Sequence, residues 1–414
     1  MNVDSTHREI VRNPLINLTD LLLKMAAKAL EEEKNRKKRI WTRNWILSRD
    51  ERGASALLLK ELAAEDVKEY KLTMRMTPEI FEDLLKKVGP KIKKQHTTLR
   101  MALTPRIKLE ITLNFLATGD SYRSLQNHYR VSKCSISKFI PEVCDAIYES
   151  LYECIKVPAS ENNWKTISSG FETHWNFPNC CGAIDGKHIL ILALPNCGSE
   201  YFGYKGSNSI VFMAVVDFNY KFLYINVSAE GSQSDGVIFK NCPISDELER
   251  GFLPEGLFLL GDDAFPLKPC LLKPYKTYRG PLTIPEKNFN YRLSRARRIV
   301  ENAFGILMSR FLIFDGKIDL KPSTIRKLVF AACSIHNWLR ESSPSYLLAS
   351  AVDQENIHTG EIIPGSWRTE IEELRNLERF RSIQSTNLAK RIRDRMKDYF
   401  NNDGAVPWQY RHIS

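Results

Sequence analysis

Three apolar segments in the second half of the chain constrain its fold more than any other feature. They read GAIDGKHILILAL, SIVFMAVVDFNYKFLYINVSAEG and GLFLLGDDAF, and each is bounded by Gly, Pro, Asn or Asp, which is typical of buried β-strands. The middle segment contains DFNY between two apolar runs and therefore predicts a hairpin. A long amphipathic helix follows in NYRLSRARRIVENAFGILMSRFLIF. Strands and helices in this order predict an α/β fold with a mixed sheet.

The composition indicates a polyanionic partner. The chain has 414 residues, with 60 Lys and Arg against 49 Asp and Glu, a formal net charge of +11 and a pI near 9.1. This balance favours nucleic acid or an anionic membrane surface. No apolar run approaches the roughly 18 residues that a membrane span needs, and the first residues lack the apolar core of a signal peptide. Nine scattered cysteines fit a reducing compartment, so we expect an intracellular protein that binds nucleic acid and no membrane.

Helices are expected over the first 160 residues. Residues 1–70 form a polar helical region with a basic cluster at 34–43, which indicates a nuclear import signal, a phosphate-binding arm or a solvated helix face. Two further helices are expected to start at Thr77 and Thr104, because a Thr N-cap followed by Pro is a favoured helix start. The second of them should end at Gly119.

A helix-turn-helix pattern lies in SYRSLQNHYRVSKCSISKFIPEVCDAI, within a helical DNA-binding domain at 71–160. A short helix, a tight turn at 131–133 and a second helix capped by Ser132 are typical of that motif. The second helix would present four polar residues to a DNA groove: Lys133, Ser135, Ser137 and Lys138. A helical hairpin used only for packing is the alternative, and Pro141 is expected to kink or end the helix after little more than two turns.

Three further segments complete the predicted organisation. The strands and the long helix form an α/β domain at 161–340. Residues 341–372 are richer in Ser, Pro, Gln, Thr and Gly and are expected to form a flexible linker or insertion. Residues 373–414 form a charged helix and a tail, in which Trp408 and Tyr410 are expected to dock on the core.

Asp185 is the one acid in the largely apolar segment GAIDGKHILILAL. A buried, ionised carboxylate is costly unless it is paired or binds a cation, so partners are expected. Asp262 follows the apolar run LFLLG, and Glu301 lies at the edge of the apolar stripe of the long helix, one turn after Arg297 and Arg298. These acids can converge on Mg²⁺ or Mn²⁺, which prefer hard oxygen ligands. Their order, strand Asp, hairpin, helix, strand Asp, helix Glu, is that of a ribonuclease H-like nuclease core.

Several neighbouring residues are weaker candidates. Asp263 is an alternative to Asp262, because the doublet leaves the register ambiguous by one residue and strand alternation points only one of the two side chains at the site. Asp217 fits a hairpin turn, Asp235 fits a helix cap or a supporting acid, and His188 fits packing or a hydrogen bond within the sheet. Each acid taken alone also has an ordinary interpretation as a turn residue, a cap or an ion-pair partner.

A set of longer motifs carries a family resemblance. The motifs are AIDGKHI (183–189), YKGSNSIVFMAVVDFNYKF (204–222), GSQSDGVIF (231–239), LLGDDAFPLKPCLLKPY (259–275), NYRLSRARRIVENAFGIL (290–307) and HNWL (336–339). Together they resemble the DDE transposases of the PIF/Harbinger superfamily and their domesticated nuclease relatives. The helix-turn-helix segment and KRIWTRNWILSRDERGASALLLKEL resemble the N-terminal region of that family, and YFNNDGAVPW resembles a recurring C-terminal ending.

The resemblance implies a metal-dependent DNA endonuclease or transposase. Asp185, Asp262 and Glu301 would be its catalytic acids and would hold two Mg²⁺ or Mn²⁺ ions, which can stabilise the attacking and leaving oxygens of a phosphodiester displacement. Three basic residues would contact the DNA backbone or, alternatively, pair with the catalytic acids: Arg297, Arg298 and Lys205. Family members usually work with a separate Myb/SANT-like DNA-binding protein. The resemblance therefore implies double-stranded DNA and such a protein as partners. It also implies a nuclear location that depends on this partner protein, and it is compatible with a homodimer.

Two alternative functions stay open at this point. A domesticated DNA-binding or adaptor protein would keep the fold without cutting DNA, and a helix-rich chromatin scaffold would use the three acids only structurally. The presence of all three acids favours the nuclease, because a chain that no longer cuts is free to lose costly buried carboxylates.

Overall fold

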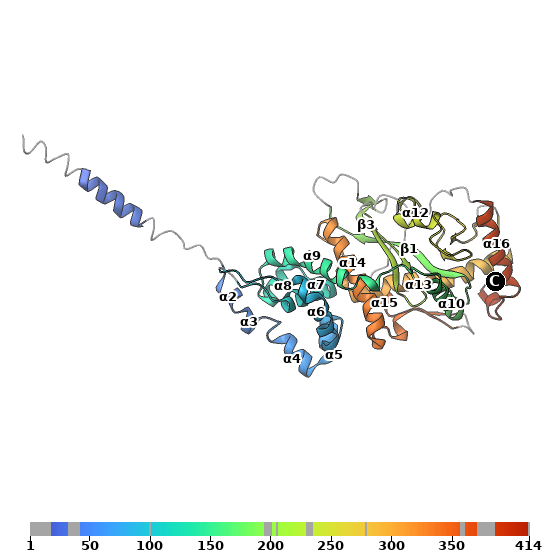
Figure 1. Ribbon diagram of the computed structural model, residues 1–414, viewed down its shortest axis with the longest axis horizontal. Helices are drawn as coiled ribbons and strands as arrows, with labels where there is room; N and C mark the ends of the chain where they lie inside the picture. Colours follow the sequence, from blue (N-terminus) through green and yellow to red (C-terminus); the bar gives the residue numbers. More distant parts are fainter. Residues whose placement is uncertain are drawn as a thin grey trace, which may run out of the picture. The chain divides into compact units, whose positions relative to one another are not determined.

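The computed structural model describes residues 18–31, 42–98, 101–193, 201–203, 206–228, 235–277, 280–356, 361–370 and 386–412. These residues belong to two compact units, Met1–Ser48 and Arg49–Ser414. In the first unit, residues 18–31 form an exposed helix and α2 spans Asn44–Leu47, while most of the predicted basic cluster lies outside the described residues. The second unit contains the described strands and the other helices (Figure 1). No helix in these ranges is long and apolar enough to cross a membrane.

Helices α3 to α10 precede the first long strand. They span Arg49–Arg52, Leu58–Glu65, Val67–Met74, Pro78–Ile92, Pro105–Thr118, Tyr122–Tyr129, Lys133–Ser150 and Glu161–Trp175. α6 and α7 begin with Pro after Thr77 and Thr104, as predicted, and α7 ends at Gly119, whose φ of 71° is a left-handed conformation that Gly adopts freely. α7 is buried on almost all sides because it packs against α5, α6, α8 and α9.

α8 and α9 form two consecutive helices, and α9 does not end at Pro141, although an end is one of the two outcomes expected there. Residues 130–132 separate them, Ser132 accepts a hydrogen bond from the amide of Ser135, and the amide of Lys133 donates to Gln126 Oε1 at 2.9 Å. α9 continues through Pro141 to its end at residue 150. Its buried face packs on α6, α7 and α14, and this burial outweighs the one hydrogen bond that the proline removes.

The main sheet is mixed. Its strands are β1 (Cys180–Leu190), β2 (Phe202–Gly203), β3 (Ser207–Val216), β4 (Phe222–Ser228), β5 (Phe258–Leu260) and β6 (Leu271–Leu272). The strand order is β2-β3-β1-β5-β6, and β4 pairs with β3. β3 pairs antiparallel with β1 and β4, whereas β5 pairs parallel with β1 and β6. The predicted α/β class is therefore confirmed.

The predicted hairpin connects β3 and β4. Asp217 Oδ1 accepts hydrogen bonds from the amides of Asn219 at 2.7 Å and Lys221 at 2.9 Å, so its side chain closes the turn, as expected. Helices α11 (Asp235–Lys240) and α12 (Pro243–Glu249) then lead to β5. Asp235, the predicted cap, is the first residue of α11.

Helices α13 (Ile284–Arg310) and α14 (Pro322–Ser342) pack on the strands. α13 contacts β1, β3 and β5, and α14 contacts β4 and α9. The predicted apolar stripe of α13 is buried: Leu293, Ala296, Val300, Ala303, Phe304 and Leu307. In α14, the buried side chain of Asn337 binds both the amide and the carbonyl of Phe222, at 2.9 and 2.8 Å. This amide side chain takes the place of a neighbouring strand for the start of β4.

The C-terminal residues pack on α13. α16 (Asn387–Asn401) packs against α13. Trp408 lies edge-on to Tyr291, with ring centroids 6.1 Å apart, and below the guanidinium of Arg295 at 4.8 Å. Tyr410, in contrast, is 48% exposed. The expected docking therefore holds for Trp408 and is wrong for Tyr410.

The segment at 341–372, for which the sequence predicts a flexible linker or insertion, contains short anchored elements in its described residues. Its described residues form 3-10 turns at Pro344–Tyr346 and Ala349–Ala351, strands β7 (Gln354–Glu355) and β8 (Ile362–Ile363), and α15 (Trp367–Glu370). Trp367 Nε1 donates to Asn302 Oδ1 of α13 at 2.9 Å, and the indole lies so close to Gly305 that a side chain there would meet it. Composition does not reveal such contacts. The predicted division of the chain into five segments stays a prediction.

Candidate active site

The strand register brings two of the predicted acids together. β1 and β5 pair in parallel, with Ala183 opposite Leu260. Asp185 and Asp262 each follow this pair by two residues, and strand alternation directs both side chains to the same side of the sheet. Burial is the main reason that the pKa of Asp185 is raised, and the neighbouring charge of Asp262 adds to the effect.

Asp185 is a buried carboxylate with little room for water. It is 7% exposed, its Oδ1 accepts a hydrogen bond from the amide of Gly186 at 3.0 Å, and its Oδ2 accepts one from Arg297 Nη1 at 3.3 Å. Burial raises the pKa of Asp185 to about 6, although the charges of Arg297 and Lys187 oppose this. At neutral pH the carboxylate is therefore mostly ionised and depends on positive charge nearby.

Arg297 joins the third predicted acid to the first. It lies one turn before Glu301 on α13, and its Nη2 donates to Glu301 Oε1 at 2.6 Å while its Nη1 contacts Asp185. Burial lowers the pKa of Arg297, but the charges of Asp185, Glu301 and Asp262 outweigh burial and raise it. One guanidinium thus interacts with a group of three carboxylates, which we call the acid cluster (Asp185, Asp262 and Glu301).

The two aspartates after β5 have different partners. Asp262 accepts a hydrogen bond from the amide of Ala264 at 2.9 Å, and burial raises its pKa against the charge of Arg297. Asp263 pairs instead with Lys276 at 3.0 Å and lies 3.9 Å from Lys273. Of the doublet, Asp262 is the residue that shares Arg297 with the other acids.

The donor atoms of the acid cluster fit a hard divalent cation. In this structure the side chain of Arg297 lies between two of the carboxylates. All three side chains offer oxygen ligands, which suit Mg²⁺ or Mn²⁺. Among the residues that the structure describes, no three His, Cys, Asp or Glu side chains lie close enough together to hold a metal ion. The guanidinium of Arg297 lies between Asp185 and Glu301 and supplies the positive charge at this place.

Sequence reasoning missed the support that α15 gives to this site. Arg368 Nη2 lies 4.0 Å from Glu301 Oε2. The same guanidinium binds both carboxylate oxygens of Asp353, with Nε at 2.8 Å from Oδ1, and the Asp353 side chain is fully buried. No sequence signal marks this pair, because Asp353 and Arg368 lie in a segment whose composition indicates a linker.

The other predicted site residues of the α/β domain do not contact the acid cluster, or they lie outside the residues that the structure describes. Arg298 contacts Glu355 Oε2 at 3.4 Å, and Arg295 shares that carboxylate at 3.0 Å. His188 Nδ1 is 2.8 Å from Ser209 Oγ, which is the hydrogen bond within the sheet that the sequence indicates. Lys205 lies outside the described residues.

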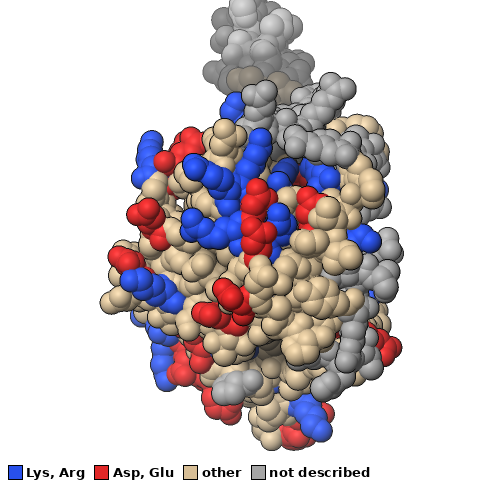
Figure 2. Space-filling model, turned by 90° about the vertical axis from the view of Figure 1, so that its right-hand side faces the viewer, with Lys and Arg blue, Asp and Glu red and all other residues tan. Residues whose placement is uncertain are grey.

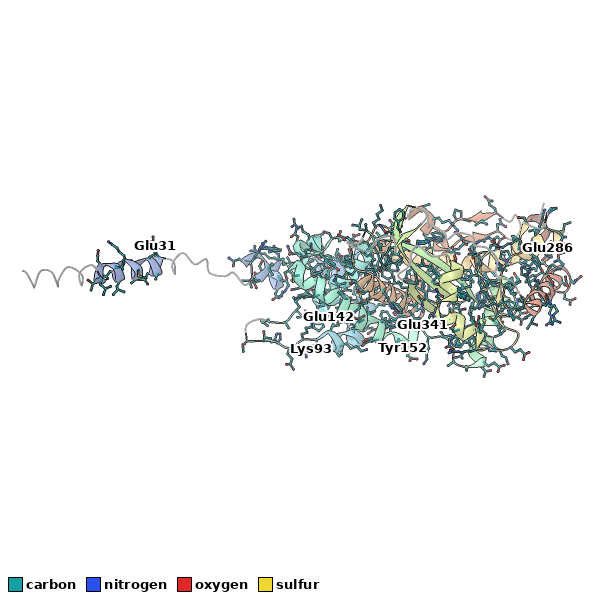
Figure 3. All side chains as sticks on the ribbon, turned by 90° about the horizontal axis from the view of Figure 1, so that it is seen from above. Glu31, Lys93, Glu142, Tyr152, Glu286 and Glu341 are labelled. Atoms are coloured by element: carbon teal, nitrogen blue, oxygen red, sulfur yellow. The ribbon has the colours of Figure 1, made fainter. Side chains whose placement is uncertain are left out.

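The predicted groove residues lie on α9. Lys133, Ser137 and Lys138 are exposed and Ser135 is half-buried. Ser135 and Lys138 border a cavity of about 290 Å³ that Lys94 and Lys108 also line. Figure 3 labels Glu142 of α9 and Glu286 at the start of α13 towards opposite ends of the second unit. The surface of α9 is therefore separate from the end of the unit at which α13 begins.

The chain is similar to a family of endonucleases and to several individual proteins. Residues 184–337 match the family described as DDE superfamily endonuclease. "Putative nuclease HARBI1" of Bos taurus is 27% identical over 240 residues, which cover 57% of this chain and 67% of that protein. "Protein ALP1-like" of Arabidopsis thaliana is 26% identical over 245 residues, which cover 56% of this chain and 59% of that protein. No solved structure gives a significant match.

The matched segment contains the acid cluster, most of β1, and all of β3 and β4. This segment is thus similar to the DDE superfamily endonucleases. The similarity to HARBI1 and to the ALP1-like protein agrees with this match and confirms the resemblance to nucleases derived from Harbinger transposases that the motifs carry.

Proposed function

We propose that the protein is a metal-dependent DNA endonuclease that cuts phosphodiester bonds with Asp185, Asp262 and Glu301, as a transposase or as a nuclease derived from one. The acid cluster carries this proposal, because its three carboxylates share one guanidinium inside the segment that matches the endonuclease family. In the reaction, a water oxygen bonds to the phosphorus and the 3′-oxygen leaves. In a transposase, the freed 3′-hydroxyl would then attack target DNA.

We also propose that the sheet is a ribonuclease H-like core and that α8 and α9 are a DNA-binding helix-turn-helix. The antiparallel strands β1, β3 and β4, the parallel β5 and the packing of α13 on these strands support the core. The short connection at 130–132 and the exposed side chains of Lys133 and Lys138 support the motif.

The acid cluster would hold the Mg²⁺ or Mn²⁺ ions. A cation bound there supplies positive charge that polarises the phosphodiester. Asp185, with a pKa of about 6, is mostly ionised at neutral pH and so available as a ligand. Arg297 would then release Asp185 and Glu301, and its guanidinium, a good phosphate binder, would be free to contact the DNA backbone.

Cleavage of supercoiled and terminal-repeat DNA by the purified protein, with Mg²⁺ or Mn²⁺, tests this function. Wild type is expected to nick the DNA, and Asp185→Asn and Glu301→Gln are expected to abolish nicking because each removes a carboxylate ligand. Asp263→Asn is the matched control and should keep most of the activity, since Asp263 faces Lys276. Equal cleavage by all four proteins, or an inert wild type in the presence of its DNA-binding partner, would refute the proposal.

A DNA-binding adaptor that does not cut is the second candidate. Arg297 pairs with both Asp185 and Glu301, so these carboxylates have a structural ion-pair partner that a DNA-binding adaptor could keep without cutting. Asp185→Asn separates the two functions in cells. A nuclease loses its effect in this variant, whereas an adaptor keeps both DNA binding and its effect.

We further propose double-stranded DNA as the substrate and a Myb/SANT-like protein as the partner that brings the chain to DNA and into the nucleus. The net charge of +11 supports a nucleic-acid partner. A homodimer stays a prediction. Proximity labelling in cells that recovers no Myb/SANT-like protein would contradict the proposed partner.

A further inference from the structure

α16 has one buried face and one basic face. Ala389, Met396 and Phe400 are buried on the side that contacts α13. The helix carries five basic residues and two acidic ones: Lys390, Arg391, Arg393, Arg395 and Lys397, with Asp394 and Asp398. The basic residues of α16 therefore outnumber its acidic residues, and they lie away from the buried face.

Arg391 and Arg395 form the outward part of this basic face. Both side chains are exposed, and their spacing of four residues puts them next to each other on the helix surface. Within the described ranges, neither forms an ion pair with an acid. Arg393, in contrast, lies 3.8 Å above the ring of Tyr275. Figure 2 views the end of the second unit that carries α16 and shows Lys and Arg side chains gathered there, with a few acids between them.

The loop after β6 ties α16 to the neighbourhood of the acid cluster. Lys276 of this loop pairs with Asp263 at 3.0 Å, directly beside the end of β5. The adjacent Tyr275 donates its hydroxyl to Asp394 of α16 and its amide to Asn290 of α13, the latter at 2.7 Å. α16 is thus fixed relative to the strand end at which the acid cluster begins.

We infer that the exposed face of α16, with Lys276 beside it, binds the phosphate backbone of double-stranded DNA next to the acid cluster. This inference rests on the proposed endonuclease function, because it assigns the surface that holds the substrate of that site. Guanidinium groups bind phosphate through two parallel hydrogen bonds, and Arg391 and Arg395 have no acid to satisfy them within the described residues. A duplex fits this surface by charge and by its position beside a site that cuts phosphodiester bonds.

Duplex binding by the full chain in EDTA tests the surface without any cleavage. Fluorescence anisotropy with a short labelled duplex is measured between about 50 and 200 mM salt. Arg391→Gln with Arg395→Gln is expected to weaken binding by about tenfold and to lower the slope of log K against log salt by about 2, since each lost phosphate contact removes about 0.9. The control is Lys317→Gln with Lys321→Gln, which removes the same charge at exposed positions before α14 and should bind within about twofold of wild type.

Each outcome decides between the alternatives. An equal loss of DNA affinity in both double variants would show that only the net charge of the chain matters for binding. Unchanged affinity in both variants would show that the α16 face does not bind DNA, so that an acidic protein becomes the expected ligand of this face. Either result refutes the inference. Circular dichroism and Tm should match wild type for both variants, because the changed side chains are exposed. A wild type that binds through α16 but does not cut with Mn²⁺ would refute the endonuclease function alone. A wild type that cuts, beside an α16 variant that binds normally, would refute the α16 surface alone.

Discussion

Asp185 is an ionisable group buried in a largely apolar strand, and Arg297 is the residue whose charge stabilises its ionised form. Nη1 of the arginine contacts Asp185 Oδ2 at 3.3 Å and Nη2 contacts Glu301 Oε1 at 2.6 Å. The carboxylate of Asp262 also acts on the same guanidinium. Removal of one partner from a buried ion pair leaves uncompensated charge, which is far more costly than the pair itself is stabilising.

Arg297→Gln is therefore expected to lower the free energy of unfolding by about 3 kcal/mol, as measured by urea unfolding without divalent cations. Arg250→Gln is the control, because Arg250 forms an exposed pair with Glu247 and its loss should cost less than about 1 kcal/mol. Added Mn²⁺ should restore part of the stability of Arg297→Gln, since the three carboxylates then bind another source of positive charge. Equal losses in both variants would show that Arg297 is not the counter-ion of the acid cluster.

The aspartate doublet, Asp262 and Asp263, shows which features of the site can be predicted from the sequence at the scale of single residues. The apolar strands and the strand-terminal acids predict where carboxylates gather, and the spacing of four residues between Arg297 and Glu301 predicts their contact. The choice between Asp262 and Asp263 needs the register of β5 on β1, which local sequence does not fix. Arg368 could not be predicted at all, because its place beside Glu301 depends on the packing of α15 on α13.

At the scale of the element, α7 carries a buried acid that makes stability depend on pH. Glu110 is 2% exposed. Burial raises its pKa from 4.5 to about 7, although the hydrogen bond of Ser55 and the charge of Arg106 oppose the shift. Because the unfolded chain releases this proton near pH 4.5 and the folded chain only near pH 7, the contribution of Glu110 to stability is complete below about pH 4.5 and is lost as the pH rises to about 7.

Glu110→Gln is expected to remove this pH dependence. At pH 8 the variant should be more stable than wild type by roughly 2 kcal/mol, because it has no buried charge to desolvate, and near pH 4.5 the two should be nearly equal. Urea unfolding at both pH values measures the difference. Glu161→Gln serves as the control: a hydrogen bond from Lys165 lowers the pKa of this exposed acid, so its replacement gains no stability at pH 8. A gain for Glu110→Gln that is the same at both pH values would contradict the argument.

The elements themselves were predicted best where local chemistry decides them. The strands, the hairpin at Asp217 and the helix starts at Thr77 and Thr104 follow from apolar runs, turn residues and caps. The continuation of α9 through Pro141 and the anchored segment at 341–372 do not, because both depend on tertiary contacts formed by distant residues. Such contacts override local propensity and leave no local pattern to read.

At the scale of the whole molecule, the two compact units separate the first 48 residues from every feature that the proposed chemistry needs. The acid cluster, α9 and α16 all belong to Arg49–Ser414. α16 is part of the core of that unit, because Met396 and Phe400 are buried and Trp408 lies against α13. The beginning and the end of the chain therefore contribute differently to stability.

A chain that starts at Arg49 is expected to keep the Tm of the full chain within about 2 °C and to cut DNA with Mn²⁺ as well as the full chain does, because it retains all contacts of the second unit. A chain that ends at residue 385 should lose more than about 5 °C in Tm, since loss of a buried Phe alone costs about 3–5 kcal/mol. Calorimetry and the nicking assay measure both. If the chain from Arg49 unfolds as readily as the chain that ends at 385, then the first 48 residues stabilise the second unit and the division into two units does not describe its folding.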